Sequence, residues 1–342
     1  MLRYAGLRGI GMREDKTTMS DIAKALNIST ISVSRALSGH DGVSGELRNR
    51  ILQKASELRY FRPKAEKAAR VLVLHRKPYV QDNSNYSIMI QDMEQALQEA
   101  GCEYDLEFVD KDLQGKQQDM PRKIARGTAY DGVVWVGRFD AGYRKRVMKG
   151  NRNCVLYAGY VPSADCDSVW YNFNNAGYQL CEFLIRQGHR KIGYLGCADG
   201  YVSREKTLGI AAALEDHGLA ADRGLFVCGN GDAEQRILEL VRSGQGPTAV
   251  ICQGDYTAAK LIQFLFEKGV RVPGDLSVVG GGNTEMSSLC IPALTTMEMH
   301  IGYACRAAAD LLRKRLAEPE KPAESILVGG TLVERDSVRP LL

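Results

Sequence analysis

The stretch from Thr18 to Gly39 constrains this chain most, because it has the pattern of two short helices joined by a tight turn. We expect Ser20 to cap the first helix, since a serine hydroxyl can accept a hydrogen bond from an unpaired backbone N–H at a helix start. The apolar residues that follow share one helical face: Ile22, Ala23 and Leu26. Asn27 should end this helix, because asparagine tolerates a left-handed backbone.

The second helix of the pair begins at Ser29 or Thr30, either of which can cap it. Its inward stripe consists of Val33, Ala36 and Leu37, and the residues left pointing outward are Thr30, Ile31, Ser34 and Arg35. A helix that exposes a hydroxyl, an apolar tip and one arginine suits the DNA major groove, where arginine pairs with guanine and a methyl group meets thymine. A plain surface helical hairpin is the alternative interpretation.

A third helix is expected from Gly45 to Arg59, capped by Ser44, and it can cover the first two. Its apolar residues repeat at helical spacing: Leu47, Ile51, Ala55 and Leu58. Residues 1–70 hold 14 Lys or Arg against 7 Asp or Glu, whereas residues 71–342 hold 31 against 34. The positive charge therefore coincides with the helix pair, as expected of a domain that neutralises phosphates, although an ordinary solvated surface could carry the same excess.

These residues resemble the DNA-binding headpiece of the lactose-repressor (LacI/GalR) family of bacterial transcriptional regulators. The segments that carry the resemblance are 21–29, 31–39, 42–44 and 60–63. The resemblance implies that bases are read by Thr30, Ile31 and Arg35, and that phosphates are contacted by Ser29, Thr30, Ser32 and Ser34. Ser20 and Lys64 complete the expected DNA-binding set. Because Ile31 can neither donate nor accept a hydrogen bond, the operator sequence does not follow.

From Val71 onward, short β-rich runs alternate with helical patterns, which indicates parallel sheets covered on both faces. Strands are expected at 71–75, 104–109, 132–136, 155–158, 192–195, 225–228, 249–252 and 277–279. Helices are expected at 87–100, 175–187, 204–217, 233–242 and 256–268, and glycines that favour left-handed helix ends follow many of them: Gly101, Gly188, Gly218, Gly244 and Gly269. So many strands suit two tandem lobes. The predicted fold is therefore a small all-α helix-turn-helix headpiece followed by two α/β, Rossmann-like lobes.

The second half of the chain resembles the effector-binding domain of the same family, which is of the periplasmic-binding-protein type. The segments that carry this resemblance are 187–196, 203–209, 254–255, 272–280 and 292–296. The resemblance implies a chain that crosses between the lobes, with lobe 1 at about 71–158 plus 291–321. Lobe 1 would include a helix near His300 to Ala317. Lobe 2 would take 159–290 plus 322–342, including a closing strand from Ile326 to Leu332.

An effector is expected in the cleft outside the carboxyl ends of the strands. Arg204 is the first choice for a ligand contact, because it aligns with an effector-binding arginine of the family and can hold two oxygens at once; a plain surface charge is the alternative. Asp255 either touches ligand or caps the following helix. The aromatic residues near the join of the lobes either stack on a ligand or pack in the core: Trp170, Tyr171 and Phe173.

Two departures from the family weaken the expectation of a standard pyranose site. Gly254 replaces the asparagine that usually precedes the aspartate, and Gly280, Gly281 and Gly282 with Asn283 replace an aspartate-rich turn. Asn283 could still donate and accept hydrogen bonds. The glycines alone are weak evidence for a phosphate site, since the lysine and hydroxyl residue of a P-loop are missing.

The segment between headpiece and lobes, residues 63–70, departs further from the family. Glu66 stands where the family places a leucine wedge in the minor groove, and the segment is about ten residues short of the family's hinge helix. We therefore expect weaker DNA bending or a different half-site spacing, which a gel-shift phasing assay would test. Residues 1–17 are expected to be a disordered arm or an over-extended start with Met12 the real one; a minor-groove contact is the weaker alternative.

Nine cysteines without Cys-x-x-Cys spacing, together with the absence of histidines at ligand spacing, favour a reducing cytoplasm and no metal or cofactor. No signal peptide and no apolar run long enough for a membrane span is apparent. The alternatives are an enzyme fused to the headpiece and a periplasmic binding protein, but no catalytic motif or export signal supports either.

We therefore expect a transcriptional regulator rather than an enzyme. It should be a repressor, with residues 18–62 as DNA-binding headpiece and 71–342 as effector and dimerisation domain. Its partners would be a pseudo-palindromic double-stranded operator, a small-molecule effector, most readily a sugar or sugar derivative, and a second copy of the chain in a homodimer or higher oligomer.

Overall fold

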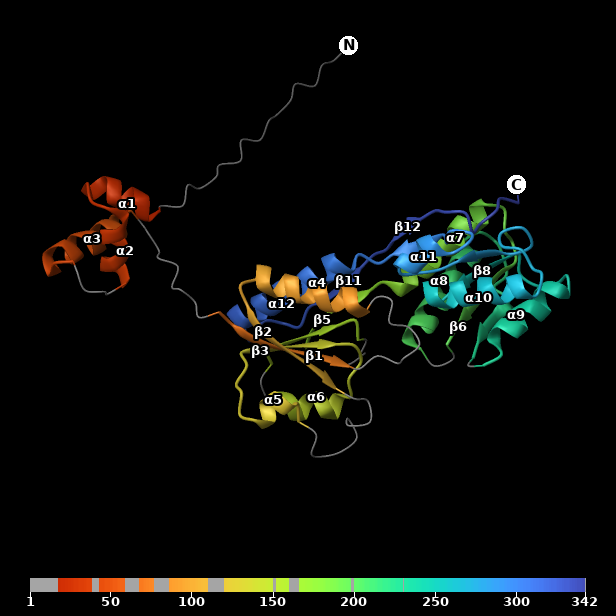
Figure 1. Ribbon diagram of the computed structural model, residues 1–342, viewed down its shortest axis with the longest axis horizontal. Coiled ribbons are helices and arrows are strands. Elements are labelled where there is room, and N and C mark those ends of the chain that lie inside the picture. The colour runs from red at the N-terminus through yellow and green to blue at the C-terminus, as the bar shows by residue number, and fades with distance from the viewer. Residues whose placement is uncertain are drawn as a thin grey trace, which may run out of the picture. The chain divides into compact units, whose positions relative to one another are not determined.

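The N-terminal unit contains three helices around a small apolar core. The computed structural model describes residues 18–38, 43–58, 68–76, 86–109, 120–149, 152–159, 166–197, 200–229 and 231–341. The chain divides into two compact units, residues 1–67 and 68–342. In the first unit, α1 (Met19–Leu26) and α2 (Thr30–Ser38) form the predicted pair and α3 (Gly45–Glu57) covers them (Figure 1). Their core consists of Ile22, Ala23, Val33, Ala36, Ile51 and Ala55.

The caps of these helices confirm three predictions and correct one. Ser29 accepts from Ser32 N at 3.1 Å and Ser44 accepts from Leu47 N at 3.3 Å, as a capping serine should. Asn27 ends α1 with φ 52°, in the left-handed region. The cap of α1, however, is Thr18 and not Ser20. The reason is a reciprocal capping box, in which Thr18 accepts from Asp21 N while the Asp21 carboxylate accepts from Thr18 N at 2.7 Å.

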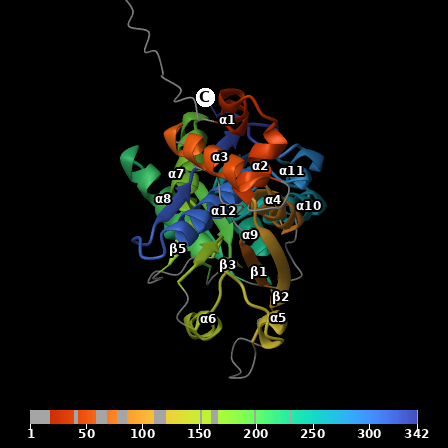
Figure 2. The same cartoon turned by 90° about the vertical axis from the view of Figure 1, so that its left-hand side faces the viewer.

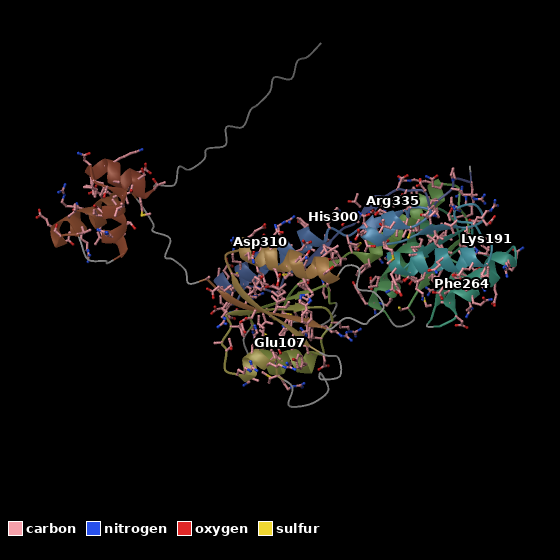
Figure 3. All side chains as sticks on the ribbon, in the orientation of Figure 1. Glu107, Lys191, Phe264, His300, Asp310 and Arg335 are labelled. Atoms are coloured by element: carbon pink, nitrogen blue, oxygen red, sulfur yellow. The ribbon has the colours of Figure 1, made fainter. Side chains whose placement is uncertain are left out.

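The first lobe is built on a parallel sheet with strand order β11-β5-β4-β3-β1-β2. Its strands are β1 (Arg70–Arg76), β2 (Glu103–Val109), β3 (Gly132–Val136), β4 (Cys154–Tyr157), β5 (Asp167–Tyr171) and β11 (Ser325–Val328). One face is covered by α4 (Tyr86–Glu99) and α12 (Ile301–Ala317), and the other by α5 (Arg122–Ala125) and α6 (Ala141–Met148) (Figures 1 and 2). Glu107 of β2, labelled in Figure 3, accepts from the backbone of Arg122 at 2.6 Å and so caps α5 from the sheet.

The second lobe is a smaller parallel sheet with strand order β7-β6-β8-β9. Its strands are β6 (Ile192–Gly196), β7 (Phe226–Cys228), β8 (Ala249–Cys252) and β9 (Ser277–Val279). One face packs on α7 (Phe173–Arg186) and α8 (Tyr201–Asp216), and the other on α9 (Ala233–Arg242) and α10 (Asp255–Glu267). Short helices η2 (Arg223–Leu225) and α11 (Glu285–Leu289) complete it.

The glycines predicted to end helices all have φ between 68° and 91°: Gly101, Gly188, Gly218, Gly244 and Gly269.

The chain passes between the lobes after β5, between β10 (Thr296–Glu298) and α12, and between β11 and β12 (Thr331–Val333). β10 and β12 pair as an antiparallel ribbon. The predicted closing strand from Ile326 to Leu332 is wrong in two respects. It is two strands interrupted at Gly329 and Gly330, and the first of them, β11, lies in the sheet of lobe 1 and not of lobe 2.

The lobe boundary at residue 159 is also wrong, because β5 belongs to the first sheet as well. The physical reason is a buried anchor that the sequence pattern does not reveal. The Asp167 carboxylate at the start of β5 accepts from Glu324 N at 2.8 Å, and the Ser168 and Ser325 hydroxyls lie 2.8 Å apart. These bonds align β11 with β5, with Ser325 opposite Ser168.

Candidate DNA-binding and effector sites

The outward face of α2 carries the side chains predicted to read DNA. Thr30, Ile31 and Arg35 are exposed, and Ile31 retains 64% of its side-chain surface, while Val33 and Ala36 on the opposite face are buried. An isoleucine this exposed on a short helix does not contribute to the core of its own unit. The helix therefore presents a hydroxyl, an apolar tip and a guanidinium together, which are groups suited to base edges in a major groove.

The other predicted DNA-binding residues have different surroundings. Ser29 and Ser32 are hydrogen-bonded to each other, with hydroxyls 2.9 Å apart, so both also serve the start of α2. Ser34 is half-buried, and Ser20 is exposed in the first turn of α1. Lys64 and Glu66 lie outside the described residues, as does the predicted N-terminal arm.

Asp255 lies at the carboxyl end of β8 and is 2% exposed. It does not cap α10, because Gly254 is the cap and no side chain bonds there. Instead one carboxylate oxygen accepts from Thr284 N at 2.7 Å and Thr284 Oγ1 at 3.0 Å, and the other accepts from Thr296 Oγ1. Both oxygens are thus bound by protein donors, and Asp255 fixes the loop after β9 and the ribbon strand β10.

Lys206 of α8 was not predicted, and its ammonium group is buried beside the same strand ends. Its side chain is 1% exposed and donates to Gln253 O at 2.8 Å. Burial lowers the pKa of Lys206 to about 8, and the Asp255 carboxylate opposes this shift. No local pattern reveals it, because its partner Gln253 lies 47 positions away in the sequence.

The two glycines after β9 leave room for these charges. A methyl group on Gly280 would lie 2.4 Å from Asp255 Oδ1, and one on Gly281 would lie 2.7 Å from Lys206 Nζ. These distances are shorter than any tolerable contact. A side chain at Gly280 or Gly281 would thus displace a buried charged group of the protein itself.

Arg204 lies in the first turn of α8 at the end of a row of aromatic rings. Its guanidinium carbon is 5.6 Å from the Tyr201 ring centroid, and it pairs with Glu205 at 3.1 Å while keeping 60% of its side chain exposed. The Tyr201 ring is 6.3 Å from Phe173, which is 5.9 Å from Tyr171. We call these four residues the Arg204 row: Tyr171, Phe173, Tyr201 and Arg204.

The Arg204 row joins the carboxyl end of β5 to the start of α8, so it links the two lobes. It offers a planar cation and aromatic faces, which suit a ligand with an anionic or hydroxyl-rich side and an apolar face. Trp170, also predicted here, is instead a core residue of β5. It is 7% exposed and lies opposite Leu327 of β11.

Asn283 lines a crevice of about 300 Å³ between α4 and the start of α12. Charged residues line the same crevice: Asp92, Glu298 and Arg306. Asn283 donates to Glu298 Oε2 at 2.8 Å and accepts from Arg335 Nη2 at 2.6 Å, so it both donates and accepts. His300, next in the crevice, and Arg335 are labelled in Figure 3. Of the predicted effector residues, Asn283 lines this crevice, and Arg204 and Phe173 meet in the Arg204 row.

The described residues offer neither a metal site nor a membrane-spanning helix. No group of three or more histidine, cysteine or acidic side chains there is arranged to hold a metal ion. None of the helices in the same residues is long and apolar enough to cross a membrane.

A helix-turn-helix unit followed by two parallel-sheet lobes defines a DNA-binding protein with a two-lobed binding domain. The family described as "Bacterial regulatory proteins, lacI family" matches residues 18–63, and the "Periplasmic binding protein-like domain" matches residues 181–338. The chain belongs to the lacI family of bacterial regulatory proteins. It is a helix-turn-helix transcriptional regulator with a periplasmic-binding-protein-like effector domain, and not an enzyme.

Curated relatives match along nearly the whole chain. The Probable HTH-type transcriptional repressor ExuR of Bacillus subtilis (strain 168) is 27% identical, covering 95% of this chain and 99% of its own. The HTH-type transcriptional repressor CytR of Escherichia coli (strain K12) is 28% identical, covering 96% and 98%.

Solved structures share the fold. The transcriptional regulator CelR in complex with cellobiose superposes with TM-score 0.66 at 22% identity, over 94% of this chain and 99% of that one. The lac repressor dimer bound to operator and the anti-inducer ONPF gives 0.65 at 19%, over 95% and 100%.

Proposed function

We propose that this regulator is a repressor that occupies a pseudo-palindromic operator as a homodimer and is controlled by a sugar or sugar derivative bound between its lobes. The DNA-binding part of this proposal is supported by the outward face of α2. There Thr30, Ile31 and Arg35 are exposed, while the opposite face packs into the buried core. In this proposal these three residues contact bases. The phosphate contacts come from Ser20, Ser29, Ser32, Ser34 and Lys64.

Selection of duplexes from a randomised pool by the purified chain tests this half. Enrichment of an inverted repeat at physiological salt is expected, because two headpieces related by a two-fold axis read two related half-sites. Binding without any sequence enrichment would contradict it.

The effector half rests on the Arg204 row, which combines a largely exposed arginine with aromatic faces at the join of the lobes. The named relatives are repressors, and the similar solved structures include regulators with cellobiose and with ribose bound. Sugars present both hydroxyls and an apolar face, which such a row can hold. We place Asn283 and Asp255 in the same effector region, Asp255 through the loop that it fixes.

A thermal-shift screen of sugars, sugar acids, phosphosugars and nucleobases tests the effector half, because a ligand that binds the folded state raises stability by mass action. Arg204→Ala should abolish the shift of the active compound and its effect on operator affinity. Unliganded DNA binding should remain near that of the wild type. The matched control is Arg190→Ala, which removes another exposed arginine of the same lobe. A preserved response in Arg204→Ala would contradict the assignment.

The homodimer is supported by an apolar groove of about 830 Å³ between α10 and the segment that follows α11. Phe266, Leu289 and Ile291 are 81%, 71% and 92% exposed. Apolar side chains gathered at this exposure are typical of an interface. In the dimer, an effector alters DNA affinity only through unequal affinity for two arrangements of the lobes, typically by about 1–3 kcal/mol.

We place the protein in the cytoplasm, where operator and effector meet. The linker prediction also remains a proposal, because residues 63–67 lie outside the described residues. With a short segment and Glu66 in place of an apolar wedge, we expect a weak central bend in the operator. A strong kink in a phasing assay would contradict this.

A further inference from the structure

Cys154 and Cys166 lie opposite each other on neighbouring strands of the first sheet. Cys154 begins β4 and Cys166 directly precedes β5, and the two strands pair in parallel with Val155 opposite Asp167. Residues at matched positions of parallel strands project on the same face of the sheet. Both cysteines accordingly belong to one apolar cluster.

Arg144 of α6 directs its guanidinium at this pair. Its Nη1 donates to Cys166 Sγ at 3.5 Å, and its Nε is buried without a hydrogen-bond partner. Within the described ranges of the chain, no carboxylate forms an ion pair with Arg144. A guanidinium that is partly withdrawn from water needs a neighbouring anion, and the group in contact that can become one is the Cys166 thiol.

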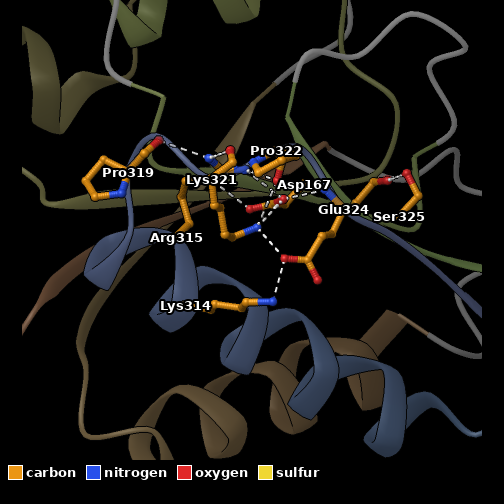
Figure 4. A network of polar contacts seen from close by, with 9 residues as sticks. Asp167, Lys314, Arg315, Pro319, Lys321, Pro322, Glu324 and Ser325 are labelled. Atoms are coloured by element: carbon orange, nitrogen blue, oxygen red, sulfur yellow. Dashed lines mark hydrogen bonds and ion pairs between the residues drawn. The ribbon is translucent and has the colours of Figure 1, made fainter.

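The acidic residue that directly follows Cys166, Asp167, is bound by other cations (Figure 4). Its carboxylate is bound by Arg315 through Nε–Oδ2 at 2.9 Å and Nη2–Oδ1 at 3.0 Å. Lys321 Nζ adds a third contact at 2.7 Å. Although it is paired with these two residues, the Asp167 carboxylate still raises the pKa of Cys166, but by less than Arg144 lowers it.

We propose that Cys154 and Cys166 form a peroxide-sensitive dithiol in which Cys166 is the reacting thiolate, stabilised by Arg144, and Cys154 the resolving thiol. The electrostatics agree with these roles. The hydrogen bond from Cys154 lowers the pKa of Cys166 most, burial opposes this, and Arg144 lowers it further. The hydrogen bond to Cys166 and burial raise the pKa of Cys154, which keeps it a thiol until the second step.

The chemistry needs one peroxide molecule, whose size is close to that of water and suits a thiol whose residue is only 8% exposed. The Cys166 thiolate attacks one peroxide oxygen, the O–O bond breaks, and the departing hydroxide takes up a proton to become water. The resulting sulfenic acid is attacked by the Cys154 sulfur, which loses its proton as a second water leaves. Two thiols give up two electrons, and one hydrogen peroxide becomes two waters.

The test uses the reduced full-length chain, freed of reductant and treated with one to a few equivalents of hydrogen peroxide. Unreacted thiols are then alkylated under denaturing conditions and the peptides are weighed by mass spectrometry. We expect a linked pair of peptides carrying Cys154 and Cys166, lighter by two hydrogens than the sum of the reduced peptides. Buried Cys181 and Cys252 should remain alkylated.

Variants separate the roles. Cys166→Ser and Cys154→Ser should each remove the linked pair, and Cys154→Ser should leave Cys166 trapped as a sulfenic acid that reacts with dimedone. Arg144→Gln should slow linkage several-fold, while Arg144→Lys should restore part of the rate because it keeps the charge. Cys228→Ser, which removes an exposed thiol elsewhere, is the control and should leave the linkage unchanged.

Two results would overturn the proposal. One is full alkylation of Cys154 and Cys166 while exposed Cys197 or Cys228 is oxidised. The other is an unchanged linkage rate in Arg144→Gln, which would show that the guanidinium does not activate Cys166.

Discussion

Buried charged side chains of the two-lobed unit depend on partners far away in the sequence. Arg315 and Asp167, separated by 148 positions, form a bidentate pair in which the side chains are 5% and 0% exposed. Burial alone would raise the pKa of Asp167, but hydrogen bonds from Arg315 and Lys321 outweigh it and hold that pKa below its ordinary value. Lys206, in contrast, has one carbonyl partner and a lowered pKa. The environment of each charge is thus determined by folding and cannot be read from neighbouring residues.

Lys206 should make stability depend on pH in the alkaline range. Its folded pKa of about 8 lies below the ordinary 10.5, so between these values the unfolded chain binds more protons than the folded one. Stability therefore rises with pH through this window, and Lys206→Met should remove up to about 3 kcal/mol of that rise. Urea unfolding of both proteins at pH 7.5 and 10.5 measures it, since other titrating groups cancel in the difference. Equal pH dependence in the two proteins would show that Lys206 is not buried as an ammonium group.

Arg35 should discriminate between base pairs. Arg35→Ala is expected to weaken binding to the selected operator by about 1–3 kcal/mol and to relax preference at one position of each half-site. Fluorescence anisotropy with the operator and with its single-base variants measures both. Arg50→Ala, which removes an exposed arginine of α3, should lower affinity for all duplexes alike. The same uniform loss for Arg35→Ala would mean that Arg35 contacts phosphate.

At the scale of elements, the sequence was most informative where a periodic pattern is long. The helices of the second lobe and the buried strands such as β3 and β8 were predicted because continuous apolar runs or helical spacing define them. β5 was missed because its first residues, Asp167 and Ser168, are polar yet buried by an ion pair and a hydroxyl contact. β11 was placed in the wrong lobe because it is an edge strand whose partner is fixed by those same contacts.

The candidate sites also differ in how well the sequence predicts them. The face of α2 follows from three local features, the cap at Ser29, the buried stripe and the turn at Asn27. Three of the four residues predicted to point outward are therefore exposed, and the fourth, Ser34, is half-buried. Asp255 and Lys206 depend on contacts between β8, α8 and the loop after β9. Their carboxylate and ammonium were therefore not recognised as buried, and the glycines that accommodate them were read as a departure from the family.

The contact between α7 and α8 depends on glycine. A methyl group on Gly209 would lie 1.9 Å from the carbonyl oxygen of Asn174, and one on Gly177 would lie 2.3 Å from that of Lys206. Gly209→Ala should therefore force the helices apart and lower the free energy of unfolding by about 3 kcal/mol. Thermal unfolding followed by circular dichroism measures this. Gly200→Ala, whose nearest atom would be 3.8 Å away, is the control and should change stability little; similar stability of both variants would show that the helices pack less closely.

At the scale of the whole molecule, the proposed homodimer should let one headpiece strengthen the binding of the other. The described residues of a single headpiece form three short helices with one proposed reading face, so half-site binding alone should be weak. Joining two headpieces in a dimer makes the second contact intramolecular, which can raise affinity by roughly 10²–10⁴ without any new contact to DNA. In the proposed homodimer the large unit would therefore contribute to DNA binding even where it does not touch DNA, because it would hold the two copies together.

Substitutions in the groove beside α10 should affect this coupling between headpieces most. The double substitution Phe266→Asp and Ile291→Asp places carboxylates where apolar side chains that are 81% and 92% exposed would otherwise be covered by the second copy. Since both positions are at the surface, the fold of each chain should persist, as circular dichroism can verify. Sedimentation velocity should then show a monomer, and affinity for the full operator should fall by about 10²-fold or more.

Affinity for an isolated half-site should stay unchanged in that variant, because α2 is not altered. Leu208→Asp, on α8 outside the groove, changes another exposed apolar residue and should leave both the dimer and the operator affinity intact. A double variant that remains dimeric would place the interface elsewhere on the large unit. A monomeric variant that still binds the full operator as tightly as the wild type would separate dimerisation from DNA binding, and the proposed coupling between two headpieces would then be wrong.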